Sequence, residues 1–167
     1  MTSFLTESLG NWRDVRVGTI DEIENIPAEH FDFRPTPDVR SVGEQVRHIL
    51  EVALMMTGEL TREDTDFRRA PWPELLAMYG GPLEHATSRD ELLALMRDQV
   101  DDATKAFEAA GEAHMMGTIT NFDGSTWTRM QWLHHGIGHE MYHCGQLTLY
   151  ARHVGVVPAL TKKILGM

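Results

Sequence analysis

Apolar residues recur at intervals of three and four along four long segments of the chain, which is the spacing of an amphipathic helix. The first expected helix extends from about Ser3 to Glu24 and gives way to a proline-containing linker. The second begins at Ser41, and the third runs from Ser88 to about Ala110. Both of these serines have a glutamate three residues later, and this capping-box pattern marks a helix start.

The fourth expected helix extends from near Thr128, which has a glutamine three residues later, to Gly155. Two long connections separate the last three helices: residues 61–87, which contain glycine and proline, and residues 112–127, which contain glycine. The first connection contains a candidate short helix at residues 72–79, with a proline near its start. Because no segment has a strong strand signal, the pattern predicts an all-α four-helix bundle.

The composition narrows the class of protein without changing this fold. The 167 residues include 25 acidic and 15 basic side chains, and the formal net charge of −10 opposes binding to nucleic acid or an anionic membrane surface. The only cysteine, Cys144, allows no internal disulfide and fits a reducing compartment. No apolar run has the length of a signal-peptide core or a membrane span. We therefore expect a cytoplasmic protein in which residues 1–167 form a single domain.

The fourth helix is unusually poor in charge. Between Gln131 and Leu149, Glu140 is the only formally charged side chain apart from the histidines. A helix of this kind is central to a bundle or shared with a partner subunit. It also contains three glycines: Gly136, Gly138 and Gly145. Each costs about 1 kcal/mol relative to alanine, a cost that the close approach of another helix would offset, so the sequence predicts a homodimer.

Three histidines of the fourth helix, His135, His139 and His143, are spaced four residues apart. In a helix they lie along one stripe, with the Cβ atoms of neighbours about 5–6 Å apart. Two imidazoles so placed can bind one metal ion, at metal–nitrogen distances of about 2.0–2.1 Å for zinc. The alternative is that they hydrogen-bond to neighbouring helices, since an unpaired buried polar group costs about 1–3 kcal/mol.

Residues 139–143 also match the H-E-x-x-H pattern of zinc proteases, in which Glu140 would be the general base. The match stops there, because no aspartate or glutamate follows Cys144 and the downstream histidine of the longer protease pattern is absent. A third metal ligand must therefore come from another segment. Spacing alone leaves four candidates open: His30, His48, His85 and His114.

Two stretches of the chain resemble the DinB/YfiT-like superfamily of metalloenzymes. They are residues 41–49 (SVGEQVRHI) on the second helix and residues 139–147 (HEMYHCGQL) on the fourth. The resemblance implies an up-down-down-up four-helix bundle that is commonly dimeric. It also implies that His48, His139 and His143 together bind one divalent metal ion.

One position departs from the family pattern, since members often have arginine where this chain has Cys144. Cys144 lies about 100° around the helix from His143, so we expect it to pack in the core rather than join the metal. His135 extends the ligand stripe by one turn, and Gln146 and Tyr150 lie on the same side. These three residues are expected to line the pocket or support the ligands.

Three neutral imidazoles leave at least one coordination position open, as catalytic metal sites do. The resemblance favours a thiol-dependent S-transferase or isomerase, in which a low-molecular-weight thiol such as bacillithiol or mycothiol attacks a small electrophile. A metal-dependent hydrolase is the alternative, and a non-catalytic, metal-stabilised dimeric binding or stress protein is a third class. Zinc, nickel, iron and copper all suit imidazole ligands. Glu44, one turn before His48, is the one candidate for a general base.

Overall fold

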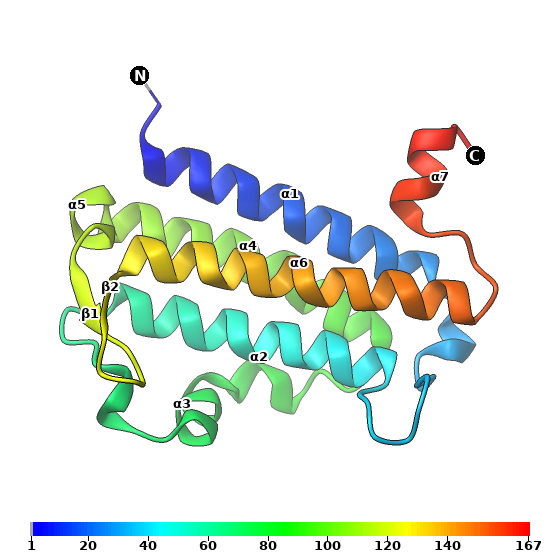
Figure 1. Ribbon diagram of the computed structural model, residues 1–167, viewed down its shortest axis with the longest axis horizontal. Coiled ribbons are helices and arrows are strands. Elements are labelled where there is room, and N and C mark those ends of the chain that lie inside the picture. Colours follow the sequence, from blue (N-terminus) through cyan, green and yellow to red (C-terminus); the bar gives the residue numbers. More distant parts are fainter. Residues whose placement is uncertain (1) are drawn as a thin grey trace.

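The computed structural model describes residues 2–167, and four long helices form its body (Figure 1). They are α1 (Phe4–Asn25), α2 (Val42–Thr61), α4 (Arg89–Ala110) and α6 (Arg129–His153). Helices α1 and α6 run in one direction, and α2 and α4 run in the other. In chain order these directions give the expected up-down-down-up topology, and α1 and α2 each pack against both α4 and α6.

All four long helices begin where the sequence predicts, and a side chain caps each of them. The hydroxyls of Ser3, Ser41, Ser88 and Thr128 each accept a hydrogen bond from the backbone N–H three residues later. Ser41 and Ser88 complete the capping box, because the glutamate three residues on accepts a hydrogen bond from the serine N–H. The predicted helix starts are therefore confirmed.

The connections contain more structure than the sequence predicts. The expected short helix between α2 and α4 is present as α3 (Trp72–Tyr79). The all-α prediction is confirmed for the body of the molecule, and the structure adds one small antiparallel hairpin before α6, formed by β1 (Thr118–Thr120) and β2 (Thr126–Thr128). Strands of three residues are too short to give an alternating pattern. Further short elements are the helices α5 (Glu112–Met115) and α7 (Ala159–Leu165) and the 3₁₀ turns Ala28–His30, Phe67–Arg69 and Gly81–Glu84.

Apolar side chains fill the interior in two clusters along the length of the bundle. The cluster nearer the hairpin includes Trp12 and Phe107, whereas the other includes Ile49. On α6, Ile137 belongs to the first cluster and Leu147 to the second, so the two histidines between them lie near the middle of the bundle. Within residues 2–167, every helix is too short or too polar to span a lipid bilayer.

The three glycines of α6 have different surroundings. A Cβ atom on Gly136 would lie 2.0 Å from Sδ of Met56, so the absence of a side chain leaves room for the end of the Met56 side chain, which comes from α2. Gly138 and Gly145 have nothing within 4 Å of the corresponding position. The close approach expected at Gly136 is therefore made inside the bundle by a side chain of α2, while the other two glycines face outward.

Candidate metal centre

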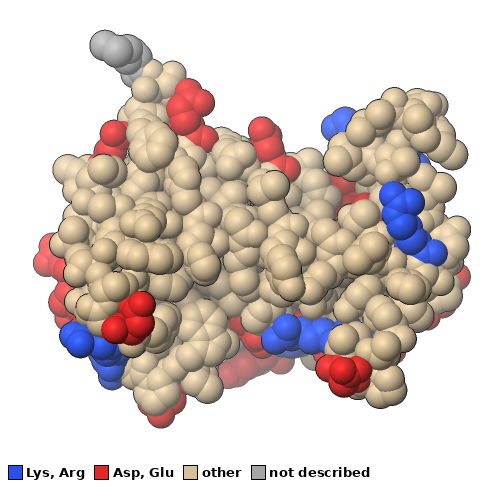
Figure 2. Space-filling model, viewed as in Figure 1, with Lys and Arg blue, Asp and Glu red and all other residues tan. Residues whose placement is uncertain are grey.

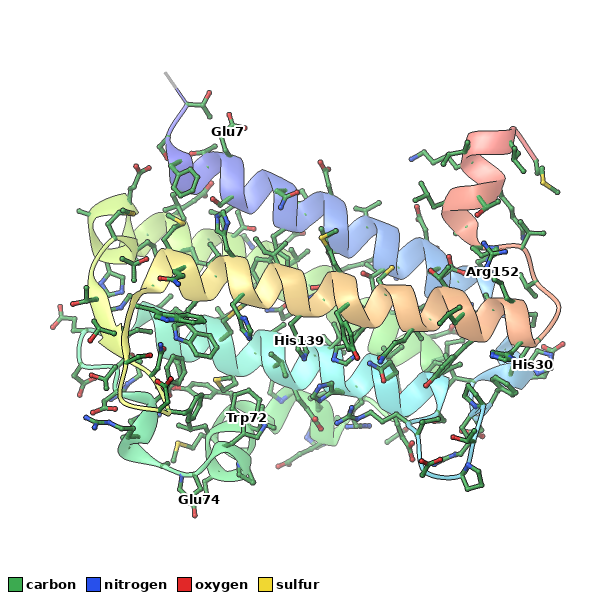
Figure 3. All side chains as sticks on the ribbon, in the orientation of Figure 1. Glu7, His30, Trp72, Glu74, His139 and Arg152 are labelled. Atoms are coloured by element: carbon green, nitrogen blue, oxygen red, sulfur yellow. The ribbon has the colours of Figure 1, made fainter. Side chains whose placement is uncertain are left out.

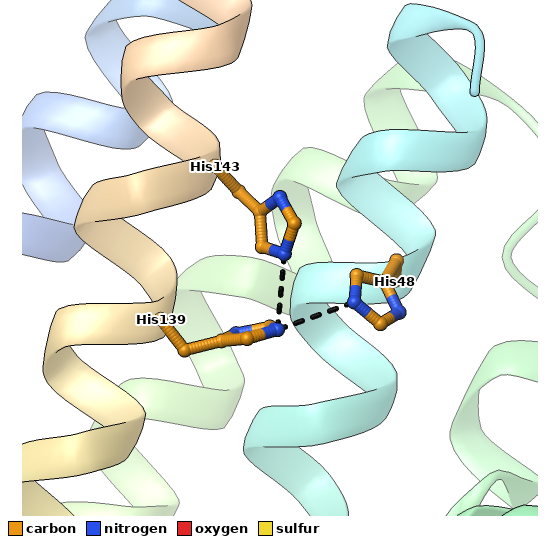
Figure 4. Close-up of side chains that lie close together, drawn as sticks. All are labelled: His48, His139 and His143. Atoms are coloured by element: carbon orange, nitrogen blue, oxygen red, sulfur yellow. Dashed lines mark hydrogen bonds between the residues drawn. The ribbon is translucent and has the colours of Figure 1, made fainter. Parts of the chain in front are cut away.

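The side chains of His48, His139 and His143 point toward one another across the contact between α2 and α6 (Figure 4). His139 and His143 are one turn apart on α6, whereas His48 lies on α2, 91 residues before His139 in the chain. The packing of α2 against α6 brings these imidazoles within reach of one another.

The three imidazoles meet through their Nε2 atoms. Nε2 of His139 lies 3.2 Å from Nε2 of His48 and 3.0 Å from Nε2 of His143, and the three candidate ligand atoms all lie within 4.8 Å of one another. A tetrahedral metal with bonds of 2.0–2.1 Å would hold its nitrogens about 3.3 Å apart. The spacing of the three nitrogens is therefore close to that of a set of metal ligands.

Burial keeps these imidazoles in the neutral form that metal binding requires. Burial first, and then the charge of Arg40, lowers the pKa of His48 to about 4. Burial and the neighbouring His143 lower the pKa of His139 to about 3, and burial also lowers the pKa of His143. All three rings are neutral near pH 7 as a result.

Side chains around the cluster orient the rings. Nδ1 of His143 donates to Oε1 of Gln146 at 2.7 Å, which leaves its Nε2 lone pair facing the other two histidines. The amide of Gln45 also contacts this Nδ1 atom. Oε2 of Glu51 lies 3.9 Å from Nδ1 of His48. The sequence interpretation missed Gln45 and Glu51, although each is three residues from His48 and so shares its side of α2.

One proton cannot bridge all three nitrogens. Since His143 carries its proton on Nδ1, only the Nε2 proton of His139 or His48 is available to link the ring nitrogens. At most one of the two contacts, at 3.0 and 3.2 Å, can then be a well-directed hydrogen bond, and the converging ring nitrogens match the donor set of a divalent cation. The residues present therefore fit a divalent metal ion.

The other predicted site residues lie in three places: a polar cavity, an aromatic cavity and the exposed surface. Gln146 supports His143 as described, and Tyr150 lines a polar cavity next to it. His135 lines an aromatic cavity on the other side of the cluster. Glu44 is exposed. Its carboxylate accepts hydrogen bonds from the backbone N–H of Ser41 and from the guanidinium of Arg34, and not from any of the three histidines. The geometry gives Glu44 a capping role.

Glu140 lies on a different face of α6 from the cluster and points toward α1. Its carboxylate accepts hydrogen bonds from Nε of Arg16 at 2.7 Å, Nη2 of Arg16 at 2.9 Å and Nε1 of Trp12 at 3.0 Å. Both charged side chains are almost completely buried. The zinc-protease interpretation therefore fails in the structure too, because its general base faces α1. Cys144 is half-buried on the same side, and burial raises the pKa of its thiol.

The aromatic cavity has a volume of about 170 Å³ and opens directly beside His139. Trp72 from the start of α3, Phe122 from the hairpin turn and Trp132 from α6 form its walls, together with His135 (Figure 3). It therefore offers a small, largely apolar binding site next to the converging imidazoles.

The fold and the three converging imidazoles define a four-helix-bundle protein with a candidate metal centre. Residues 12–147 match the family model of the DinB superfamily, and the chain belongs to this superfamily. None of the curated proteins matches the chain.

Several solved structures share the fold. YjoA from Bacillus subtilis, a DinB-like protein, has 20% identity and a TM-score of 0.67, with 89% of this chain and 92% of that chain covered. YfiT from Bacillus subtilis, described as a probable metal-dependent hydrolase with an unusual four-helix bundle topology, has 16% identity and a TM-score of 0.66, with 93% and 91% covered. A mycothiol-dependent maleylpyruvate isomerase has 17% identity and a TM-score of 0.67, but only 63% of its chain is covered, against 88% of this one. At these identities the likeness establishes the fold alone.

Proposed function

We propose that this protein is a metal-dependent enzyme in which His48, His139 and His143 bind one divalent ion. The convergence of their Nε2 atoms, at separations of 3.0 and 3.2 Å, carries the proposal. A divalent ion there would lower the pKa of a thiol or water at its open coordination position. Zinc, nickel, iron and copper are all compatible with three imidazole ligands.

The reaction class that we propose is thiol-dependent S-transfer or isomerisation of a small electrophile. The aromatic cavity beside His139 suits an apolar electrophile, with His135 at its edge. The polar cavity lined by Gln146 and Tyr150 suits a hydrophilic low-molecular-weight thiol. The mycothiol-dependent isomerase among the structural neighbours supports this class. Such thiols work in a reducing cytoplasm, where we place the protein.

The metal itself is tested by elemental analysis of the purified protein. We expect about one divalent ion per chain, and its loss in His48→Ala, His139→Ala and His143→Ala. His135→Ala is the matched control, because His135 lies one turn from His139 and lines the cavity without joining the cluster. Metal retained in His48→Ala would contradict the proposed ligand set.

Activity assays separate the reaction classes. Turnover that requires both a thiol and an electrophile supports the transferase or isomerase. Ester or amide hydrolysis without a thiol supports the alternative, a metal-dependent hydrolase, which the description of YfiT favours. Bound metal with no turnover of either kind would leave a non-catalytic, metal-stabilised binding or stress protein.

We also propose that two copies associate through the outer face of α6. Met141, Tyr142 and Leu149 are each more than half exposed there, and Gly138 and Gly145 leave the helix surface open. Figure 2 shows this face almost without charged side chains, which gather at its edges. A second copy can present the same face across a twofold axis. Light scattering should find a dimer that Leu149→Asp converts to monomer, and a monomeric wild-type protein would refute this assembly.

A further inference from the structure

The polar cavity lies on the opposite side of the metal centre from the aromatic one and has a volume of about 440 Å³. Along α6, His135 and His139 line the aromatic cavity, whereas Gln146 and Tyr150 line the polar one. These two pairs lie on either side of His143 in the helix. The two cavities therefore flank the converging imidazoles.

The walls of the polar cavity connect it to the metal centre. Gln45 from α2 and Gln146 from α6 line it, and the amides of both contact Nδ1 of His143. The segment before α2 contributes Asp38, Val39 and Arg40. The hydroxyl of Tyr150 donates to the carbonyl oxygen of Arg40 at 3.1 Å and so fixes the backbone at this point.

Arg40 is the one guanidinium in the lining of this cavity, and its side chain is exposed. Within residues 2–167, no carboxylate makes an ion pair with Arg40, whereas the nearby Arg34 pairs with Glu44 at 2.9 Å. Asp38 also lines the cavity, but its carboxylate accepts a hydrogen bond from the hydroxyl of Thr36 at 2.6 Å. Burial is the largest cause of the lowered pKa values of the three clustered histidines, and the charge of Arg40 is a smaller cause for each of them. Arg40 therefore lies within electrostatic reach of the metal centre.

We propose that Arg40 binds the carboxylate of the thiol that serves this metal centre. The inference rests on the proposed thiol-dependent function and specifies its cofactor as a small thiol with a carboxylate group. A guanidinium is a strong partner for a carboxylate, and the amides of Gln45 and Gln146 suit the polar remainder of such a molecule. The lining of the aromatic cavity contains no lysine or arginine, so we assign this cavity to the electrophile.

The test uses protein loaded with Co²⁺. A thiolate bound to Co²⁺ gives a charge-transfer band in the absorption spectrum, and this band measures thiol binding directly. The probes are N-acetylcysteine and N-acetylcysteinamide, which differ only in carboxylate against carboxamide. We expect the wild type to bind the acid about fivefold more tightly, and Arg40→Gln to reduce the ratio to about one. Because the two thiols have different pKa values, the decisive quantity is the change in this ratio on substitution.

Three further variants sharpen the result. Arg40→Lys keeps the charge and should keep most of the preference. Arg34→Gln removes a charge of the same sign from the same segment, but from an existing ion pair, and should leave the ratio unchanged. Asp38→Asn removes the negative charge from the cavity and should increase the preference for the acid.

The outcomes distinguish this inference from the proposed function. If both thiols give the charge-transfer band but Arg40→Gln leaves their ratio unchanged, the role of Arg40 is refuted while the thiol-dependent function stands. If Co²⁺ binds but neither thiol gives the band, the thiol function fails and the inference fails with it. If Co²⁺ does not bind, the metal centre itself is refuted.

Discussion

Replacing Glu140 by alanine should destabilise the protein strongly while leaving its affinity for metal unchanged. Glu140 follows the candidate ligand His139 in the chain, yet its carboxylate is buried against Arg16 and Trp12 on a different face of α6. The two readings of the H-E-x-x-H string therefore predict opposite results. A general base would be needed for activity and not for folding, whereas a buried ion pair is needed for folding.

The magnitude follows from the burial of the pair. The side chain of Arg16 is 0% exposed and that of Glu140 is 3% exposed, and two hydrogen bonds of 2.7 and 2.9 Å join them. Removing the carboxylate leaves a buried guanidinium without a counter-charge, which costs about 3–5 kcal/mol. For a chain of this size, roughly 2–4 °C per kcal/mol, the midpoint of thermal unfolding should fall by about 6–20 °C.

Urea unfolding of the metal-free protein measures this loss, and titration with a divalent metal measures the affinity. The double variant Arg16→Met with Glu140→Leu is the matched control, because removing both charges should restore much of the stability lost by Glu140→Ala alone. A change in unfolding free energy below about 1 kcal/mol would refute the reasoning. Loss of metal or activity at unchanged stability would restore Glu140 as a catalytic candidate.

Three further predictions follow from the same structure. Glu51→Gln should weaken metal binding about tenfold in a chelator competition, because it removes the carboxylate beside Nδ1 of His48, and an unchanged affinity would show that Glu51 does not support the ligand. Gly136→Ala should destabilise by about 1–3 kcal/mol in urea unfolding, whereas Gly10→Ala, with open space around it, should not destabilise. Glu91 has its pKa lowered to about 2 by the backbone N–H of the capping serine, so its stabilisation is complete above pH 4.5 and is lost as the pH falls toward 2. Glu91→Gln should flatten that part of the acid-unfolding curve, and an identical curve would contradict this assignment.

The long helices were predictable because local interactions determine where they begin. Ser41 and Ser88 each carry a complete capping box, and Thr128 caps α6 in the expected place. The hairpin between residues 118 and 128 was missed, because three-residue strands give almost no alternating pattern. Its turn did carry a local signal, since Gly124 follows Asp123 and adopts a positive φ of 84°.

The metal centre was predictable only in part from the residues. The spacing of His139 and His143 identifies two candidate ligands on one helix, but His48 lies on another helix, and no local pattern distinguishes it from His30, His85 or His114. The register between α2 and α6 decides which histidine reaches the other two. The family resemblance supplied that information, and the structure brings this set of three together.

The buried pair of Arg16 and Glu140 carried a signal that could have been found. Arg16 is four residues after Trp12, so it falls on the inward face of α1, and Glu140 is the lone carboxylate in a charge-poor helix. Two opposite charges that both belong to buried faces have a reason to pair. Arg40 gave no comparable signal, because it lies in a connection whose path depends on tertiary contacts.

The aromatic cavity takes its walls from two kinds of structure. His139 and Trp132 are fixed on α6, but Trp72 and Phe122 belong to connections outside the four long helices. Connections tolerate substitution and insertion better than packed helices do. Substitutions at Trp72 and Phe122 should therefore reshape this cavity while the imidazole cluster, held on α2 and α6, stays in place.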